Sequence, residues 1–252
     1  MTMGKIAAIV NINEMKVACE DCSLRELCLP LGLNDEDIGH LGKLVKRKHT
    51  VKKGEFLYRI GDTFSGLFAI NAGSIKTSEL ARNGHVQITG FHLPGELLGM
   101  DAISSERHPC DAVALEATEV CEIPLDTLEE LARKVPGLQR QLLRIMSSEI
   151  LKEETLLMML GKMSAEGRMA ACLMSFYERF DRLGISSRKF RLTMSRQDIG
   201  DYLGLALETV SRLFSRFQDE GLIKVEGRHV ELLDLDELWR LAGGQVMPRH
   251  KV

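Results

Sequence analysis

Three cysteines near the start of the chain, Cys19, Cys22 and Cys28, form a Cys-x2-Cys-x5-Cys run. Thiolates are soft ligands that select zinc, copper(I) or iron–sulfur clusters. The spacing lets one short loop direct three thiolates at one centre. We therefore predict a sensing or structural metal site, with a fourth ligand that comes from elsewhere in the chain.

A second region with recognisable chemistry is a pair of predicted helices that follows Ser195. Its apolar residues have helical spacing in two blocks, separated by Gly204, which permits a tight turn: Ile199 and Leu203, then Leu207, Val210 and Phe214. The opposite face of the second helix carries Glu208, Ser211 and Arg212. Arg can bond guanine, Glu can accept from cytosine, and Ser can bond either kind of base edge. This pattern predicts a helix-turn-helix that reads double-stranded DNA.

The residues around this helix pair fit the same interpretation. Ser195 suits the N-cap of the first helix, with Asp198 completing a capping box, and we include Ser195 among the DNA-binding residues. Arg216 lies one turn beyond Arg212 and is better placed for a phosphate. Residues 182–228 contain nine Lys or Arg and six Asp or Glu, although the whole chain has a net charge of −3. Positive charge is therefore concentrated where DNA would lie.

A hairpin pattern follows the second helix. Residues 221–230 alternate in the manner of two short strands, with Gly227 at the turn. Two helices and a hairpin together predict a winged helix. The alternative is an ordinary helical hairpin without a DNA-binding role.

The middle of the chain is expected to be a β-domain. Between residues 50 and 125, glycines separate short apolar runs such as 56–58 and 67–70, and residues 71–73 and 82–85 have the composition of hairpin turns. Many short strands at this spacing predict a β-sandwich or jelly roll.

A long helix is predicted between this β-domain and the helix-turn-helix, over residues 138–163. Leu and other good helix formers dominate it, and six residues repeat at spacings of three and four: Leu143, Met146, Ile150, Glu153, Leu157 and Leu160. Such a seam suits a helix that pairs with its own copy, or equally one that packs within its own domain. The carboxylate of Glu153 favours the first alternative, since the core of a single chain rarely holds one.

Bulk properties narrow the class of protein. The 252 residues are 44% hydrophobic and 27% charged, which is the balance of a globular protein with room for two domains. No apolar run is long enough for a membrane span, and the first apolar stretch is only five residues long. Six cysteines without disulfide-like spacing suit a cytoplasmic protein. The seven histidines are scattered and no catalytic motif accompanies them, so an enzyme is not expected.

Together these motifs resemble the CRP/FNR superfamily of transcription regulators, and specifically its oxygen-sensing FNR/ANR branch. The resemblance extends over almost the whole chain, through the cysteine run and residues 87–93, 120–124, 190–194 and 208–212. It implies an α+β fold with an N-terminal double-stranded β-roll, a long dimerisation helix and a C-terminal winged helix. The implied divisions are a cluster-binding segment (1–30), the β-roll sensor domain (31–136), the dimerisation helix (137–163) and the DNA-binding domain (164–252).

The resemblance also implies a cofactor and partners. Cys121 would be the fourth ligand of a [4Fe–4S] cluster, whose assembly without oxygen promotes homodimerisation and DNA binding, and whose destruction by oxygen releases DNA. The expected DNA is a palindrome of TTGAT-type half-sites, and RNA polymerase is the expected protein partner of this activator. By analogy alone, the loops at Gly84 and 104–109 are candidate polymerase contacts. Of the remaining cysteines, Cys172 is expected to be buried and inert, and Cys110 to be a surface thiol.

Two alternatives keep most of this fold. A cyclic-nucleotide-responsive regulator would need an Arg-Ser pair for the phosphate, but His108 and Pro109 occupy those positions, so no cyclic nucleotide is expected. A structural zinc site or a thiol–disulfide switch could use the same cysteines, and sequence alone leaves that open.

Overall fold

The computed structural model describes Cys22, Cys28 and residues 36–39, 47–80, 84–184 and 188–244. Eight strands form two four-stranded antiparallel sheets, with orders β1-β8-β3-β6 and β2-β7-β4-β5. The strands are β1 (Arg47–Val51), β2 (Phe56–Tyr58), β3 (Gly66–Ala72), β4 (Ile75–Leu80), β5 (Val86–His92), β6 (Leu97–Leu98), β7 (Asp111–Ala114) and β8 (Thr118–Pro124), with a short 3-10 helix at Met100–Ala102. This arrangement confirms the predicted β-roll.

The central strands β3 and β8 bury side chains on both of their faces. Phe68 and Ile70 point between the two sheets, into a cluster that also contains Val120. The alternate residues Leu67 and Ala69 face outward, into a second cluster. The period-two alternation of a strand thus lets one pair of strands serve two cores.

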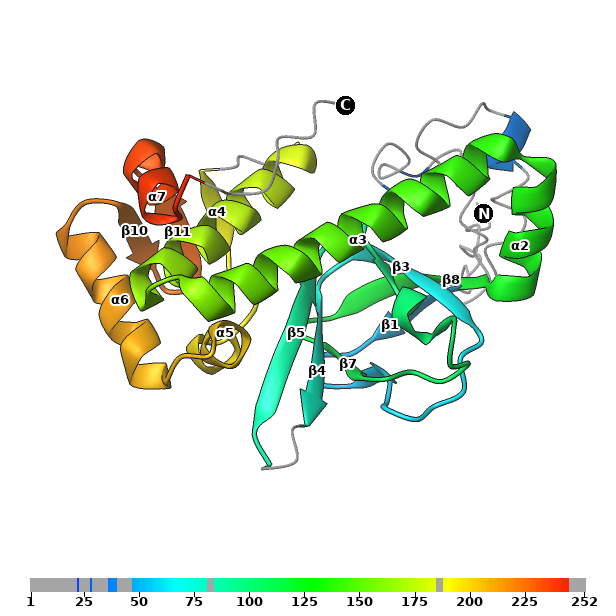
Figure 1. Ribbon diagram of the computed structural model, residues 1–252, viewed down its shortest axis with the longest axis horizontal. Coiled ribbons are helices and arrows are strands. Elements are labelled where there is room, and N and C mark those ends of the chain that lie inside the picture. Colours follow the sequence, from blue (N-terminus) through cyan, green and yellow to red (C-terminus); the bar gives the residue numbers. More distant parts are fainter. Residues whose placement is uncertain are drawn as a thin grey trace, which may run out of the picture.

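Two helices follow the β-roll and cover this second cluster. The first, α2 (Leu125–Lys134), was not predicted from the sequence, and it buries Leu128 and Leu131 against the sheet. The second, α3 (Pro136–Lys162), begins with Pro at a position where its missing N–H has no helical partner, and it extends across the molecule (Figure 1). The long predicted helix is therefore present.

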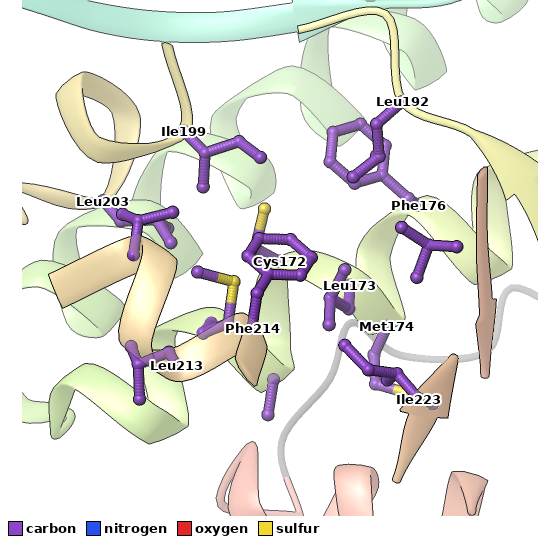
Figure 2. Packing of buried hydrophobic residues seen from close by; sticks show 14 of the residues in the cluster. Cys172, Leu173, Met174, Phe176, Leu192, Ile199, Leu203, Leu213, Phe214 and Ile223 are labelled. Atoms are coloured by element: carbon purple, nitrogen blue, oxygen red, sulfur yellow. The ribbon is translucent and has the colours of Figure 1, made fainter. Parts of the chain in front are cut away.

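The C-terminal part contains α4 (Ala165–Arg182), β9 (Lys189–Arg191), α5 (Arg196–Leu203), α6 (Leu207–Asp219), β10 (Ile223–Glu226), β11 (His229–Leu232) and α7 (Leu235–Leu241). The three strands form a sheet of order β10-β11-β9, with Gly227 at the β10–β11 turn in the left-handed region. Side chains from α4, α5, α6 and β10 meet in one apolar core (Figure 2). This is the predicted winged helix, and the α+β fold is confirmed.

None of the helices within the described residues is both long enough and apolar enough to span a membrane.

Candidate functional site

Cys121 lies in the middle of β8, at the centre of a sheet. It pairs with Lys48 of β1 on one side and with Ala69 of β3 on the other. Its half-buried side chain packs against the cluster that contains Ala69 and Ile123, on the face covered by α2 and α3. The predicted fourth ligand is therefore next to the start of the long helix.

Two cysteines of the N-terminal run lie on this same face of the sheet. Cys28 packs against the same apolar cluster as Cys121. The Cys22 thiol is 3.7 Å from Asn71 Oδ1, and the Asn71 amide donates to Glu119 at 3.0 Å. Because Asn71 is two residues beyond Ala69 on β3, this contact lies roughly 7 Å along the strand from the Ala69–Cys121 pair.

The complete ligand set is not described in the structure, because Cys19 lies outside the described residues. Within the part of the chain that is described, no group of three or more His, Cys, Asp or Glu side chains is close enough to hold a metal ion. What the structure does provide is a common face for the other three thiols.

The two remaining cysteines are both buried. Cys172 packs in the winged-helix core, as predicted, and burial raises its pKa to about 12. The prediction for Cys110 was wrong: its side chain is only 3% exposed, and its thiol donates to Asp101 at 3.5 Å. Its neighbour Pro109 made the segment look like a polar loop, but strand β7 begins immediately after Cys110 and carries it inward.

An apolar stripe on α3 is uncovered in the single chain. Leu143, Ile150 and Leu157 are 61%, 56% and 70% exposed, and Met146 is also exposed. Glu153 is exposed on the same stripe. A helix that packed only within its own domain would not leave such a row in water, so this finding favours the pairing alternative.

Leu160, the last residue of the predicted seam, has a different environment. It is half-buried, and a Cβ built at Gly204 would lie 3.6 Å from its Cδ2 atom. Gly204 is the left-handed C-cap of α5, with φ of 63°. The seam therefore ends against the turn of the helix-turn-helix.

The first helix of the pair, α5, begins as predicted. The Ser195 side chain accepts from the Asp198 N–H at 3.0 Å, and the Asp198 carboxylate accepts from the Ser195 N–H at 2.8 Å. The turn after it is tight, because a Cβ at Gly200 would meet the Leu205 carbonyl oxygen at 2.5 Å. Any larger residue at position 200 would move α6 away from α5.

The reading face of α6 is open to solvent. Glu208, Ser211 and Arg212 are all exposed, on the side opposite the buried Val210 and Phe214. The spacing of Leu207 with Val210 and Phe214 predicts that all three face inward, and for Leu207 this is wrong, since it is 39% exposed. Leu207 is the first residue of α6, so it extends past the edge of the core.

Arginines at both ends of the helix pair already have partners. Arg216 forms ion pairs with Glu220, at 2.7 Å, and with Glu166 of α4. The Arg196 guanidinium lies over the Phe214 ring, 3.1 Å from its centroid, and burial lowers its pKa to about 10. Any contact that Arg216 makes with a phosphate must therefore compete with two carboxylates.

Comparison with known proteins agrees with this geometry. Residues 48–135 match the cyclic nucleotide-binding domain family, and residues 167–241 match the Crp-like helix-turn-helix domain family. The chain is 51% identical over 228 residues, 90% of its length and 93% of the relative's, to the transcriptional activator protein anr of Pseudomonas aeruginosa. It is 45% identical, over 90% of this chain and 88% of the relative, to the anaerobic regulatory protein of Haemophilus influenzae. The chain belongs to the CRP/FNR family of transcription regulators.

A solved structure extends the comparison to three dimensions. FixK2 from Bradyrhizobium japonicum is 31% identical, with a TM-score of 0.71 over 77% of this chain and 96% of that one. The relatives are named as transcription regulators with a helix-turn-helix domain, and not as enzymes. The absence of a catalytic motif in the sequence agrees with this membership.

A buried charged network joins the two halves of this CRP/FNR regulator, and sequence reasoning did not find it. Arg179 of α4 donates to Glu96 of the β-roll at 2.9 Å and 2.6 Å, and also to the Phe91 carbonyl oxygen. Lys152 of α3 lies 3.7 Å from Glu96. Burial acts to raise the pKa of Glu96, but Arg179 and Lys152 hold it far below its usual range. Glu96 and Lys152 are 56 positions apart and Lys152 and Arg179 are 27 apart, so no local pattern marks them.

Two further contacts connect the β-roll to the segment before α5. Ser74 and Thr193 share a hydrogen bond of 2.7 Å, and Arg191 pairs with Glu116 at 2.8 Å. In the sequence, residues 190–194 contribute to the family resemblance, but nothing in their pattern indicates a contact with the β-roll. In the structure this segment is one of the places where the winged helix contacts the β-roll.

A cavity of about 450 Å³ lies between the β-roll, α3 and α4 of this CRP/FNR regulator. Its acidic lining residues are Glu79, Asp101, Glu149 and Glu153, whereas its cations Lys152 and Arg179 are engaged by Glu96 and Glu149. Pro109 also lines it, and offers no N–H. The cavity is therefore lined by more carboxylates than lysine and arginine side chains.

Proposed function

We propose that this regulator is oxygen-responsive, with a [4Fe–4S] cluster held by Cys19, Cys22, Cys28 and Cys121. In the absence of oxygen the cluster promotes homodimerisation and sequence-specific DNA binding, and oxygen destroys it and releases DNA. The observation that carries the proposal is the packing of Cys28 and Cys121 against one apolar cluster.

The chemistry of the donor set supports this cofactor. Four thiolates are the ordinary ligands of such a cluster, and half-buried thiols beside an apolar surface protect it from solvent. Cys22, held near Asn71, and Cys28 lie on the face of β3 and β8 that Cys121 occupies. When bound, the cluster would supply an oxygen-labile link between the N-terminal segment and the β-roll. The name of the Haemophilus influenzae relative, an anaerobic regulatory protein, is in line with such a response.

The position of these thiols suggests how their state reaches the long helix. Leu138 at the start of α3 is fully buried in the cluster that Cys28 and Cys121 contact, and Leu142 and Ile145 pack against it. The exposed stripe begins on the same turns of the helix, at the neighbouring residues Leu143 and Met146. A cluster that fixes the thiols in place would therefore stiffen the first turns of α3. Stiffer first turns would favour the pairing of α3 with a second copy.

The reading unit supports sequence-specific binding by that dimer. Glu208, Ser211 and Arg212 are exposed on one face of α6, and we propose that they read a TTGAT-type half-site while Ser195 and Arg216 contact the DNA backbone. We further propose the divisions 1–30, 31–136, 137–163 and 164–252 as functional parts, a cytoplasmic location, activation through RNA polymerase and no response to cyclic nucleotides.

Anaerobic reconstitution with iron and sulfide tests the proposal. We expect a broad visible absorption band and binding to a palindromic site, both of which disappear together on exposure to air. Cys121→Ala should lack the band, whereas the matched variant Cys172→Ala should keep it because that thiol lies in a separate core. A colourless, air-stable protein that contains zinc would show that the cysteines form a structural site instead.

A further inference from the structure

The first helix of the DNA-reading pair, α5, is attached to the β-roll at its N-terminal end. Lys76 of β4 contacts the Asp198 carboxylate at 2.5 Å, and the two side chains are only 24% and 14% exposed. Asp198 is also the residue that completes the capping box with Ser195. Burial acts to raise the pKa of Asp198, but hydrogen bonds from Lys76 and Ser195 outweigh burial and lower that pKa, which favours the carboxylate form. The β-roll thus reaches the group that starts the helix.

The C-terminal end of α5 has a second attachment. Gln87 of β5 donates to the Asp201 carbonyl oxygen at 2.8 Å and lies 3.4 Å from that of Tyr202. Carbonyl groups in the last turn of a helix have no partner within the helix, so they are open to such a donor. The Tyr202 ring also packs 5.1 Å from the ring of Phe91.

Together these attachments fix the direction of α5 as well as its position. Lys76 and Gln87 project from paired antiparallel strands, and α5 lies beside β5 (Figure 1). Their contacts on the helix are three to four residues apart, roughly 5 Å along its axis. The apolar core already holds α5 against the β-roll, and two polar contacts at opposite ends of the helix add a constraint on its direction.

The orientation of α5 also determines that of α6. The tight approach of Gly200 to the Leu205 carbonyl leaves the two helices one relative arrangement. The β-roll is in turn joined to α3 through the cluster around Leu138. A chain of rigid contacts therefore runs from α3, through the hairpin of β4 and β5, to the reading face of α6.

We propose that Lys76 and Gln87 are positioning residues for DNA reading, which fix α6 relative to α3 so that the dimer accepts one separation of half-sites. This inference rests on the proposed function, in which α3 pairs two copies on a palindrome. One base pair added between half-sites rotates the second one by about 35°, which a fixed pair of reading helices cannot follow.

Binding of the reconstituted full-length protein to three palindromes tests the inference. The three differ only in their spacer, which has the natural length or is one base pair longer or shorter. We expect the wild type to prefer the natural spacer by about tenfold or more, and Lys76→Met with Gln87→Ala to reduce that preference to about threefold or less. Lys76→Arg keeps the ion pair and should keep the preference, as should Lys53→Met, which removes an exposed lysine from the same β-roll.

Several outcomes would overturn the inference. A double variant that retains the spacer preference, or that weakens binding equally on all three palindromes, leaves Lys76 and Gln87 with a merely structural role. If the double variant does not fold, each single variant provides the same comparison. In all of these variants Arg179 still joins α4 to the β-roll, so the two halves stay connected. A reconstituted wild type that binds none of the palindromes contradicts the proposed function instead.

Discussion

His92 is a neutral side chain in a charged neighbourhood. Its Nε2 lies 3.1 Å from the Thr77 hydroxyl, and it faces the group of Glu96, Lys152 and Arg179. Burial lowers its pKa to about 4, and Lys152 and Arg179 act in the same direction while Glu96 opposes them. The junction of the two halves therefore contains a histidine that resists protonation.

This histidine predicts that the clusterless protein loses stability in mild acid. The unfolded chain binds the proton near pH 6.5 but the folded chain only near about pH 4, so stability is complete above about 6.5 and decreases as the pH falls through that window. The slope from His92 is at most about 1.4 kcal/mol per pH unit. Urea unfolding at several pH values should show a shallower slope in His92→Gln. His108, whose pKa is also lowered by burial, contributes a slope of the same sign, and an unchanged slope in His92→Gln contradicts the assignment.

Arg212 and Arg216 should differ in the kind of binding that they provide. Arg212→Ala should cost about 1–3 kcal/mol and relax the choice of base at one position, because its guanidinium is exposed on the reading face. Arg216→Ala should weaken all sequences alike and reduce the salt dependence of binding. Titrations against single-base variants of the site, at two salt concentrations, separate the two effects. If Arg216→Ala leaves the salt dependence unchanged, Arg216 stays paired with Glu166 and Glu220 in the complex and does not contact a phosphate.

At the scale of elements, α3 has two different halves. Its first turns are covered, with Leu138 and Gln141 buried beneath α2 and the sheet. Its middle is uncovered, with Leu143, Ile150 and Leu157 in water. The same helix therefore packs within its own chain at its first turns, and again at Met159 near its end, and offers a pairing surface on the stripe between them.

Glu153 should limit pairing along that surface. Across a two-fold axis it would meet its own copy, and like charges on a desolvated seam disfavour association. We expect Glu153→Ala to lower the dissociation constant of the clusterless dimer by about tenfold, or roughly 1.4 kcal/mol. Sedimentation of the two proteins measures this shift. The matched variant Glu154→Ala removes an exposed carboxylate that lies beside the seam, and an equal effect there would mean that net charge, rather than position, is responsible.

At the scale of the whole molecule, the two halves share a single apolar core. Phe91 of the β-roll packs against Phe176 of α4 and Tyr202 of α5, with ring centroids 6.0 Å and 5.1 Å apart. Ile88 and Leu115 belong to the same cluster as the winged-helix residues of Figure 2. Together with the polar contacts around Arg179, this core makes the junction between the β-roll and the winged helix a packed interface rather than a flexible joint.

Phe91→Ala should therefore uncouple the unfolding of the two halves and also lower the stability of the protein. Removal of a buried phenylalanine costs about 3–5 kcal/mol, and here the loss falls on the junction. We expect one calorimetric transition for the wild type and two for the variant. Phe56→Ala, at an exposed site on β2, should shift the transition only slightly and leave it single. A single transition in Phe91→Ala would show that the polar contacts alone couple the halves.

Much of this molecule could be predicted from local pattern. The capping box at Ser195, the turn at Gly204 and the seam of α3 depend on neighbours in the sequence, so their spacing was sufficient. The resemblance to the CRP/FNR superfamily supplied Cys121, which no spacing links to Cys28. The network of Glu96, Lys152 and Arg179 depends on how separate elements meet, and no local signal marks it. Cys110 was misplaced for the same reason, since its burial is decided by the strands around β7.

Because of the uncovered stripe on α3, DNA binding depends on the concentration of the protein itself. If half of every DNA-binding unit must come from a second molecule, the quantity of dimer varies with the square of the monomer concentration while monomers predominate. While the promoter is far from saturated, a twofold change in synthesis then alters its occupancy about fourfold. The level at which this gene is expressed would therefore adjust the response of its promoters without a change in any residue of the regulator.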